Sequence, residues 1–146
     1  MASATPNPPY EITQEERTMG TLAHVLQLVT TWMGPLVIFF VKRDSLFVRF
    51  HALQALLLQV CAAILSIVGI GLFFATMVAT VWRSGSASHT APPPAVFVVF
   101  PIFWLVGMSV WVIILVVAIV YAIKAGRGEW AEYPVLGRLA RHLLKM

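Results

Sequence analysis

The chain has 146 residues, of which 60% are hydrophobic and 11% are charged. Soluble domains carry about 25% charged residues, so this composition excludes a water-soluble protein and predicts an integral membrane protein. The net charge of +4 does not indicate nucleic-acid binding, because the basic residues lie at the ends of apolar runs, as membrane orientation requires. Cys61 is the single cysteine, which excludes an intramolecular disulfide.

The N-terminal part of the chain combines a polar tail with a first apolar run. Residues 1–14 are rich in Pro, Ser and Thr and are predicted to be disordered. Residues 20–41 contain no charged residue and are long enough to cross a hydrocarbon core of about 30 Å as one helix. Gly34-Pro35 is expected to kink this helix, because proline removes a backbone donor.

Two longer apolar runs follow, at residues 52–82 and 95–123. Each exceeds the roughly 20 residues that a membrane span needs, so each helix is expected to tilt or to project beyond the lipid. The Ser-, Gly- and Pro-rich stretch at residues 83–94 is predicted to be a loop between them.

Residues 135–146 have the pattern of a short amphipathic helix. Leucines recur at helical spacing and basic residues lie on the other side, as in Leu139 and Leu143 against Arg138 and Arg141. Such a helix is expected to lie in the headgroup region. The predicted fold is therefore all-α: a polytopic membrane protein with three transmembrane helices and a short C-terminal amphipathic interfacial helix.

The basic residues predict the orientation of these spans. With three spans, only Arg17 and Arg83 lie on one side of the membrane. The other side carries eight basic residues, namely Lys42, Arg43, Arg49, Lys124, Arg127, Arg138, Arg141 and Lys145. The N-terminus is therefore predicted to lie outside and the C-terminus in the cytoplasm.

No catalytic motif is recognisable, and the predicted spans contain no Asp or Glu. Intramembrane chemistry usually relies on such residues, so we expect a non-enzymatic protein without a cofactor or a metal site. The polar residues left to consider are His24 and Gln27 in the first run and His51 and Gln54 at the start of the second. They either bond between helices and to headgroups or form a polar track for an ion or solute.

Depth in the membrane is expected to keep these two polar clusters apart. In the three-span topology, His24 lies near the outer surface and His51 near the cytoplasmic surface. Phe47, Phe50, Trp130 and Tyr133 are expected to be interfacial anchors beside the basic loops. Ala118 and Ala122 form a small-x3-small pair that would allow close helix approach.

Two stretches carry a resemblance to a known family. KRDSLFVRFHALQAL at residues 42–56 and GRGEWAEYP at residues 126–134 are similar to the Tic-twenty-like domain-of-unknown-function family of small bacterial integral membrane proteins. The resemblance covers residues 15–134 and implies a multi-pass protein of the bacterial cytoplasmic (inner) membrane. The candidate functional or interfacial polar residues of the chain are His24, Gln27, Arg49, His51, Gln54, Glu129, Trp130 and Tyr133.

Taken with the resemblance, the sequence favours a membrane protein that packs with partners and assists protein translocation or membrane-complex assembly. The expected partners are the lipid bilayer, other membrane proteins or further copies of the chain, with no nucleic acid and no known small-molecule substrate. The alternative is an oligomeric pore or transporter for a small solute or ion. A lipid- or stress-responsive membrane protein is also compatible with the pattern.

Overall fold

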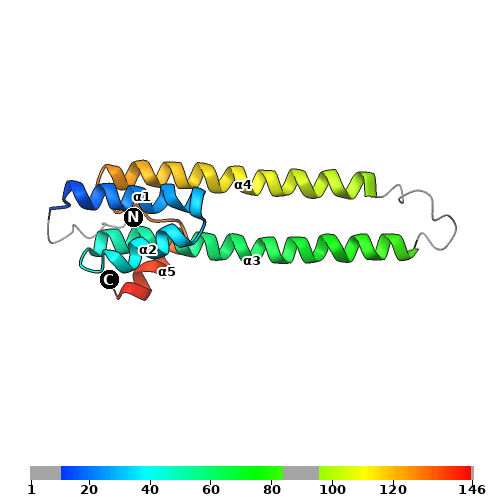
Figure 1. Ribbon diagram of the computed structural model, residues 1–146, viewed down its shortest axis with the longest axis horizontal. Coiled ribbons are helices and arrows are strands. Elements are labelled where there is room, and N and C mark those ends of the chain that lie inside the picture. Colours follow the sequence, from blue (N-terminus) through cyan, green and yellow to red (C-terminus); the bar gives the residue numbers. More distant parts are fainter. Residues whose placement is uncertain (1–10, 84–95, 146) are drawn as a thin grey trace, which may run out of the picture. The chain divides into compact units, whose positions relative to one another are not determined.

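The computed structural model describes residues 11–83 and 96–145, and these residues form helices and no strands (Figure 1). The elements are α1 (Gln14–Thr30), α2 (Met33–Val41), α3 (Leu46–Arg83), α4 (Val96–Gly126) and α5 (Leu136–Leu144). They belong to two compact units. Unit 1 comprises the described residues up to Val60 and from Ile114 onwards, and unit 2 runs from Cys61 to Ile113.

A capping box fixes the start of α1. The Thr13 hydroxyl accepts a hydrogen bond from the Glu16 amide at 3.2 Å, and the Glu16 carboxylate accepts one from the Thr13 amide at 2.9 Å. Two donors that the first helical turn would leave unpaired are thus satisfied. Residues 1–10 of the predicted tail lie outside the described residues, and its last residue, Gln14, already belongs to α1.

The first apolar run is not a transmembrane helix, so the prediction of three spans is wrong. The run divides into α1 and α2, and α2 runs back beside α1 (Figure 1). An ion pair between Glu15, at the start of α1, and Lys42, just after α2, joins the two ends of this helical hairpin. Of the described helices, only α3 and α4 are long and apolar enough to cross a membrane.

The chain reverses at Thr31, which has a φ of 55°, an uncommon conformation for a β-branched residue. Pro35 does not kink a long helix, because it falls in the first turn of α2, where a missing N–H breaks no helical hydrogen bond. The Gly34 amide donates instead to the Thr30 hydroxyl at 2.9 Å. Turn chemistry therefore overrides a run of hydrophobic residues long enough to span.

The two long helices extend beyond the predicted runs. Helix α3 begins at Leu46 and not at residue 52. The Ser45 hydroxyl accepts a hydrogen bond from the Val48 amide at 3.1 Å and so caps the helix. Helix α4 continues to Gly126, beyond the predicted end at residue 123. Most of the predicted loop at residues 83–94 lies outside the described residues, and Arg83 is the last residue of α3.

Unit 2 contains α3 from Cys61 onwards and α4 up to Ile113. Arg83 is the single charged side chain among its described residues. Its apolar side chains are largely exposed, as shown by Leu65 at 62% and Trp104 at 56%. Phe73 of α3 packs on Phe103 of α4, with ring centroids 4.4 Å apart. A surface of this kind suits lipid or other apolar helices and not water.

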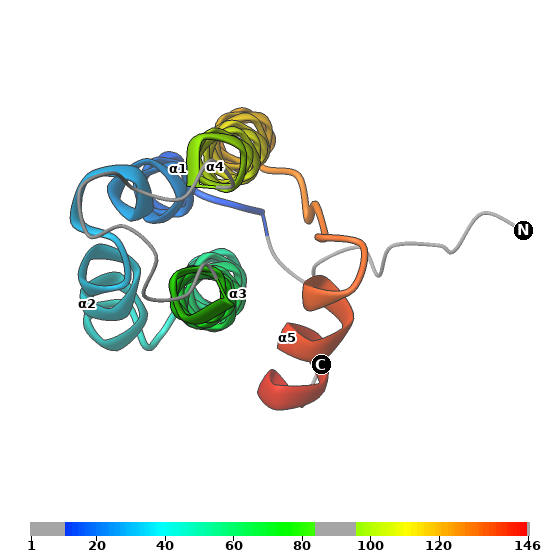
Figure 2. The ribbon, with the colours of Figure 1, turned by 90° about the vertical axis from the view of Figure 1, so that its right-hand side faces the viewer.

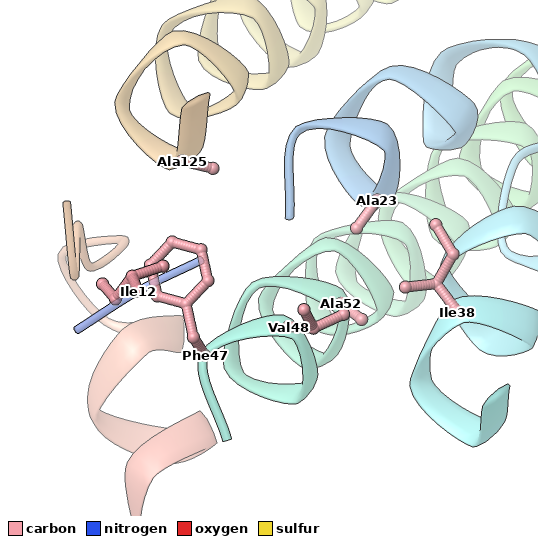
Figure 3. Close-up of a cluster of buried hydrophobic side chains, with 7 residues drawn as sticks. All are labelled: Ile12, Ala23, Ile38, Phe47, Val48, Ala52 and Ala125. Atoms are coloured by element: carbon pink, nitrogen blue, oxygen red, sulfur yellow. The ribbon is translucent and has the colours of Figure 1, made fainter. Parts of the chain in front are cut away.

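Unit 1 holds the buried core (Figure 3). Its hydrophobic cluster draws on the stretch before α1 and on α1 to α4, through Ile12, Ala23, Ile38, Phe47, Val48, Ala52 and Ala125. The face of α4 towards α1 is made of small residues, and the Thr21 hydroxyl donates to the Ala122 carbonyl at 3.2 Å. Ala118 and Ala122 are both buried, and the close helix approach that this pair would allow stays a prediction.

The short C-terminal helix is present as α5, on the α3 side of unit 1 (Figure 2). Gly137 and Ala140 face the protein, whereas Leu139 and Leu143 are exposed. A β-carbon on Gly137 would lie 2.6 Å from the Glu132 β-carbon, so only glycine allows this approach. The exposed leucines agree with an interfacial helix, which stays a prediction.

Candidate functional site

Two histidines from different helices meet inside unit 1. His24 Nε2 of α1 lies 3.1 Å from His51 Nδ1 of α3, and both side chains are fully buried. Tyr133 Oη lies 3.0 Å from His24 Nδ1, and His51 Nε2 lies 3.1 Å from the Glu129 carbonyl oxygen. We call His24, His51, Gln54 and Tyr133 the histidine network.

The Glu129 carbonyl sets the direction of the hydrogen bonds that link it through His51 and His24 to Tyr133. The Glu129 carbonyl can only accept, so His51 carries its proton on Nε2 and its Nδ1 is an acceptor. His24 must then donate from Nε2, which leaves its Nδ1 to accept from the Tyr133 hydroxyl. Both imidazoles are neutral in this arrangement, and all four ring nitrogens are satisfied.

Burial favours the neutral forms that this arrangement needs. It lowers the pKa of His24 from 6.5 to about 3, and the neighbouring His51 lowers it further. Burial also raises the pKa of the Tyr133 hydroxyl. The nearby Gln27 side chain lowers the Tyr133 pKa and so opposes part of that rise. Gln27 Nε2 and Oε1 are buried and have no hydrogen-bond partner among the described residues.

Gln54 holds the segment between α4 and α5 by its backbone. Its Nε2 donates to the Ala131 carbonyl at 3.1 Å, and its Oε1 accepts from the Tyr133 amide at 2.7 Å. With the bond from His51 to the Glu129 carbonyl, two α3 side chains fix three positions of this segment. The segment is irregular, so these bonds replace those that a helix would supply.

Aromatic rings enclose the network on one side. Phe47 and Phe50 are buried, and both contact Trp130, with ring centroids 5.3 and 5.5 Å from it. Phe47 also packs against His51 at 4.5 Å. The expectation that Phe47, Phe50 and Tyr133 are interfacial anchors is therefore wrong, because all three fill the interior of unit 1.

The remaining predicted residues lie around this centre. Gln27 is buried, and its backbone carbonyl accepts a hydrogen bond from Gln59 Nε2 at 2.8 Å. Arg49 places its guanidinium 5.2 Å from the Phe39 ring centre. Glu129 takes part through its carbonyl oxygen, while its carboxylate lies 3.9 Å from Arg127.

The sequence did not bring the two histidines together, and the expected separation of the clusters is wrong. That separation depended on one helix running from residue 20 to 41, whereas the chain reverses direction at Thr31 between α1 and α2. Tyr121 was also missed as part of the site: its hydroxyl donates to the Glu132 carbonyl at 2.6 Å. The segment after α4 is irregular, so its carbonyl groups need donors other than helical amides. A tyrosine near such a segment in the sequence is the signal that could have identified Tyr121.

The chemistry of the network is that of a neutral, directed hydrogen-bond chain. Nothing in it is a nucleophile activated by an adjacent base, because His24 accepts from a phenol whose pKa is raised. Within residues 11–83 and 96–145, no group of three or more His, Cys, Asp or Glu side chains could hold a metal ion. The hydrogen bonds of the network join α1, α3 and the segment after α4.

Comparison with known proteins corrects the family assignment. The family model described as the magnetosome magnetite crystal formation protein family (MamF/MmsF) matches residues 15–140. No curated protein and no solved structure matches the chain. The resemblance to the Tic-twenty-like family is wrong, because the family model that matches the chain is that of the magnetosome family. Residues that suggested the resemblance, such as His51, Gln54 and Tyr133, are buried in unit 1.

Proposed function

Because the chain belongs to the magnetosome magnetite crystal formation protein family, we propose that it serves crystal formation as a non-enzymatic assembly protein of the magnetosome membrane. In this role it crosses the membrane with α3 and α4 and packs there against other helices. The translocation role had no support other than the rejected resemblance and is not retained.

The observation that carries this proposal is the exposed apolar surface of α3 and α4. The most apolar 18-residue stretch of α3 is 0% buried, and that of α4 is 6% buried. In unit 2, hydroxyl groups donate to carbonyls of their own helices: Ser66, Thr76, Thr80 and Ser109 each bond one turn back. Apolar packing is therefore what these helices offer to a partner.

The same hydroxyl groups argue against the alternative of a pore. A pore for an ion or polar solute needs polar groups that face its lumen. The described part of unit 2 carries no charged side chain before Arg83, and its hydroxyls already bond within their helices. Flux of ions through liposomes that contain the purified protein would favour the pore instead.

We propose a revised topology in which both termini face the cytoplasm. The α1–α2 hairpin enters and leaves on one side, as the ion pair between Glu15 and Lys42 supports. Arg17 then joins the eight basic residues already assigned to that side, and Arg83 is alone on the other. Reporter fusions before Met1 and after Met146 should both report the cytoplasm; an N-terminal fusion that reports the opposite compartment would restore three crossings.

The role in crystal formation is tested by deletion and complementation in a magnetosome-forming bacterium that carries the gene. Deletion should change the size or number of magnetite crystals seen by electron microscopy, and the wild-type gene should restore them. The paired variant Ser66→Ala, Thr76→Ala is the matched control for a pore, and it should complement fully. Normal crystals in the deletion strain would refute the proposed role.

A further inference from the structure

A groove opens between α1 and α4 within unit 1, and neither the family nor the histidine network assigns it a use. It is an open groove with a volume of about 350 Å³, which lies within the range of about 300–1,000 Å³ typical of ligand pockets. Its walls include Thr21, Val25 and Leu28 of α1 and Ala118, Ala122 and Gly126 of α4. Small residues at every fourth position of α4 keep that wall low.

The groove runs along α4 from its C-terminal end. Gly126 is the last residue of the helix and Ala118 lies eight residues earlier, a rise of about 12 Å. The lining is almost entirely apolar, and the Thr21 hydroxyl already donates to the Ala122 and Arg17 carbonyls. An apolar groove of this length fits a segment of hydrocarbon chain, and the Thr21 hydroxyl is not free to donate to a polar solute.

Positive charge lies at the Gly126 end of the groove. Arg17 lies one turn before Thr21 on the same face of α1. Its guanidinium lies against Gly128, since a β-carbon built there would be 3.0 Å from Arg17 Nε, a buried nitrogen without a hydrogen-bond partner among the described residues. Arg127 directly follows Gly126, and its Nη1 lies 3.9 Å from the Glu129 carboxylate, too far for a hydrogen bond.

We propose that this groove binds one anionic glycerophospholipid, with an acyl chain against the exposed lining residues Val25 and Ile119 and the phosphate at Arg17 and Arg127. The charge is complementary, and the apolar channel begins where the cations are, as the phosphate and acyl chain of a lipid require. This inference rests on membrane insertion and not on a role in crystal formation, so either can fail without the other.

The full-length protein in a neutral detergent tests the site by native mass spectrometry. Phosphatidylglycerol should bind as one retained molecule per chain and more tightly than phosphatidylcholine. A basic residue near a lipid surface contributes about fivefold in affinity for anionic lipid, so Arg17→Gln should weaken phosphatidylglycerol binding about fivefold. Arg138→Gln removes an equal charge from the exposed face of α5 and should leave binding within twofold.

A second pair of variants tests the acyl chain. Ile119 lines the groove and is 47% exposed, whereas Ile113 is 61% exposed and lies outside it. Ile119→Trp should abolish retention of phosphatidylglycerol, and Ile113→Trp should retain it. Circular dichroism checks that each variant is folded, and the arginine pair decides alone if Ile119→Trp is not.

Three results would overturn the proposal. Equal affinity for phosphatidylglycerol and phosphatidylcholine would remove the role of the cations. Equal retention by the two tryptophan variants would remove the role of the groove. Tight binding of glycerol 3-phosphate, which has the same phosphate chemistry but no acyl chain, would show a simple anion site in place of a lipid site.

Discussion

Replacing Gln54 by methionine tests whether polar bonds hold unit 1 together. Gln54 is fully buried and makes two hydrogen bonds to the backbone, to the Ala131 carbonyl and from the Tyr133 amide. Methionine has a similar length but leaves both backbone groups unpaired. Each buried unpaired group costs about 1–3 kcal/mol, so Gln54→Met should destabilise unit 1 by about 2–6 kcal/mol. The alternative is that these bonds are as weak as the average hydrogen bond between membrane helices, about 0.6 kcal/mol. The loss for the two bonds would then be only about 1 kcal/mol.

The assay is denaturant unfolding in detergent, combined with hydrogen exchange of residues 129–140. Gln59→Met is the matched control, because Gln59 makes one bond, to the Gln27 carbonyl, and is half-buried. It should lower the free energy of unfolding by about 1 kcal/mol and leave exchange near Tyr133 unchanged. If Gln54→Met matches Gln59→Met in both measurements, Gln54 does not hold the segment and the reasoning is refuted.

Three further predictions concern the network and the hairpin. Since the pKa of His24 falls from 6.5 to about 3 on folding, its contribution to stability is complete above pH 6.5. Thermal unfolding should show stability lost as the pH falls through this window, by up to about 1.4 kcal/mol per pH unit, and His24→Gln should reduce the slope. Glu15→Cys with Lys42→Cys, in a Cys61→Ala background, should form an intramolecular crosslink on oxidation in membranes; no crosslink would contradict the hairpin. A β-carbon at Gly34 would lie 2.4 Å from the nearest side-chain atom, so Gly34→Ala should lower the unfolding free energy by about 1–3 kcal/mol, and unchanged unfolding would contradict this packing.

The helical class and the two long helices could be predicted because local sequence determines them. Hydropathy identifies residues 52–82 and 95–123 as helical spans, and the alternation of Leu139 and Leu143 with Arg138 and Arg141 identifies the short C-terminal helix. Both signals depend only on residues within a few helical turns. The helix ends depended on caps such as Ser45, which hydropathy does not register.

The hairpin could not be predicted by the same means. Counting apolar residues from 20 to 41 measures length and not direction, so two short antiparallel helices give the same count as one long helix. Thr31 carries the reversal, and because the residue at this position is neither glycine nor asparagine, nothing in the sequence signals its positive φ. Pro35 does not decide between the two arrangements, because proline is equally suited to kink a helix or to begin one.

The histidine network was missed as a consequence of this topology error. His24 and His51 were each recognised, and their separation followed only from opposite depths in the membrane. Because the chain reverses direction after α1, ring nitrogens of two histidines 27 residues apart in the sequence lie 3.1 Å from each other. The polar residues of such a chain are therefore informative about contact only after the number of crossings is known.

The position of the carboxylates bears on the proposed role in crystal formation. All six acidic residues precede Ser45 or follow Gly128, so the stretch from Ser45 to Gly128, with both membrane helices and their connection, has none. Several of the six are already engaged: Glu16 caps α1, and the carboxylates of Glu15 and Glu132 pair with Lys42 and Arg141. Carboxylates are the side chains that would bind iron at a mineral surface through oxygen. In the proposed topology the opposite compartment receives none of these carboxylates, so the proposed role there rests on helix packing and not on binding iron. A reporter that places Met146 on the crystal side would reverse this conclusion and bring Glu129 to the mineral.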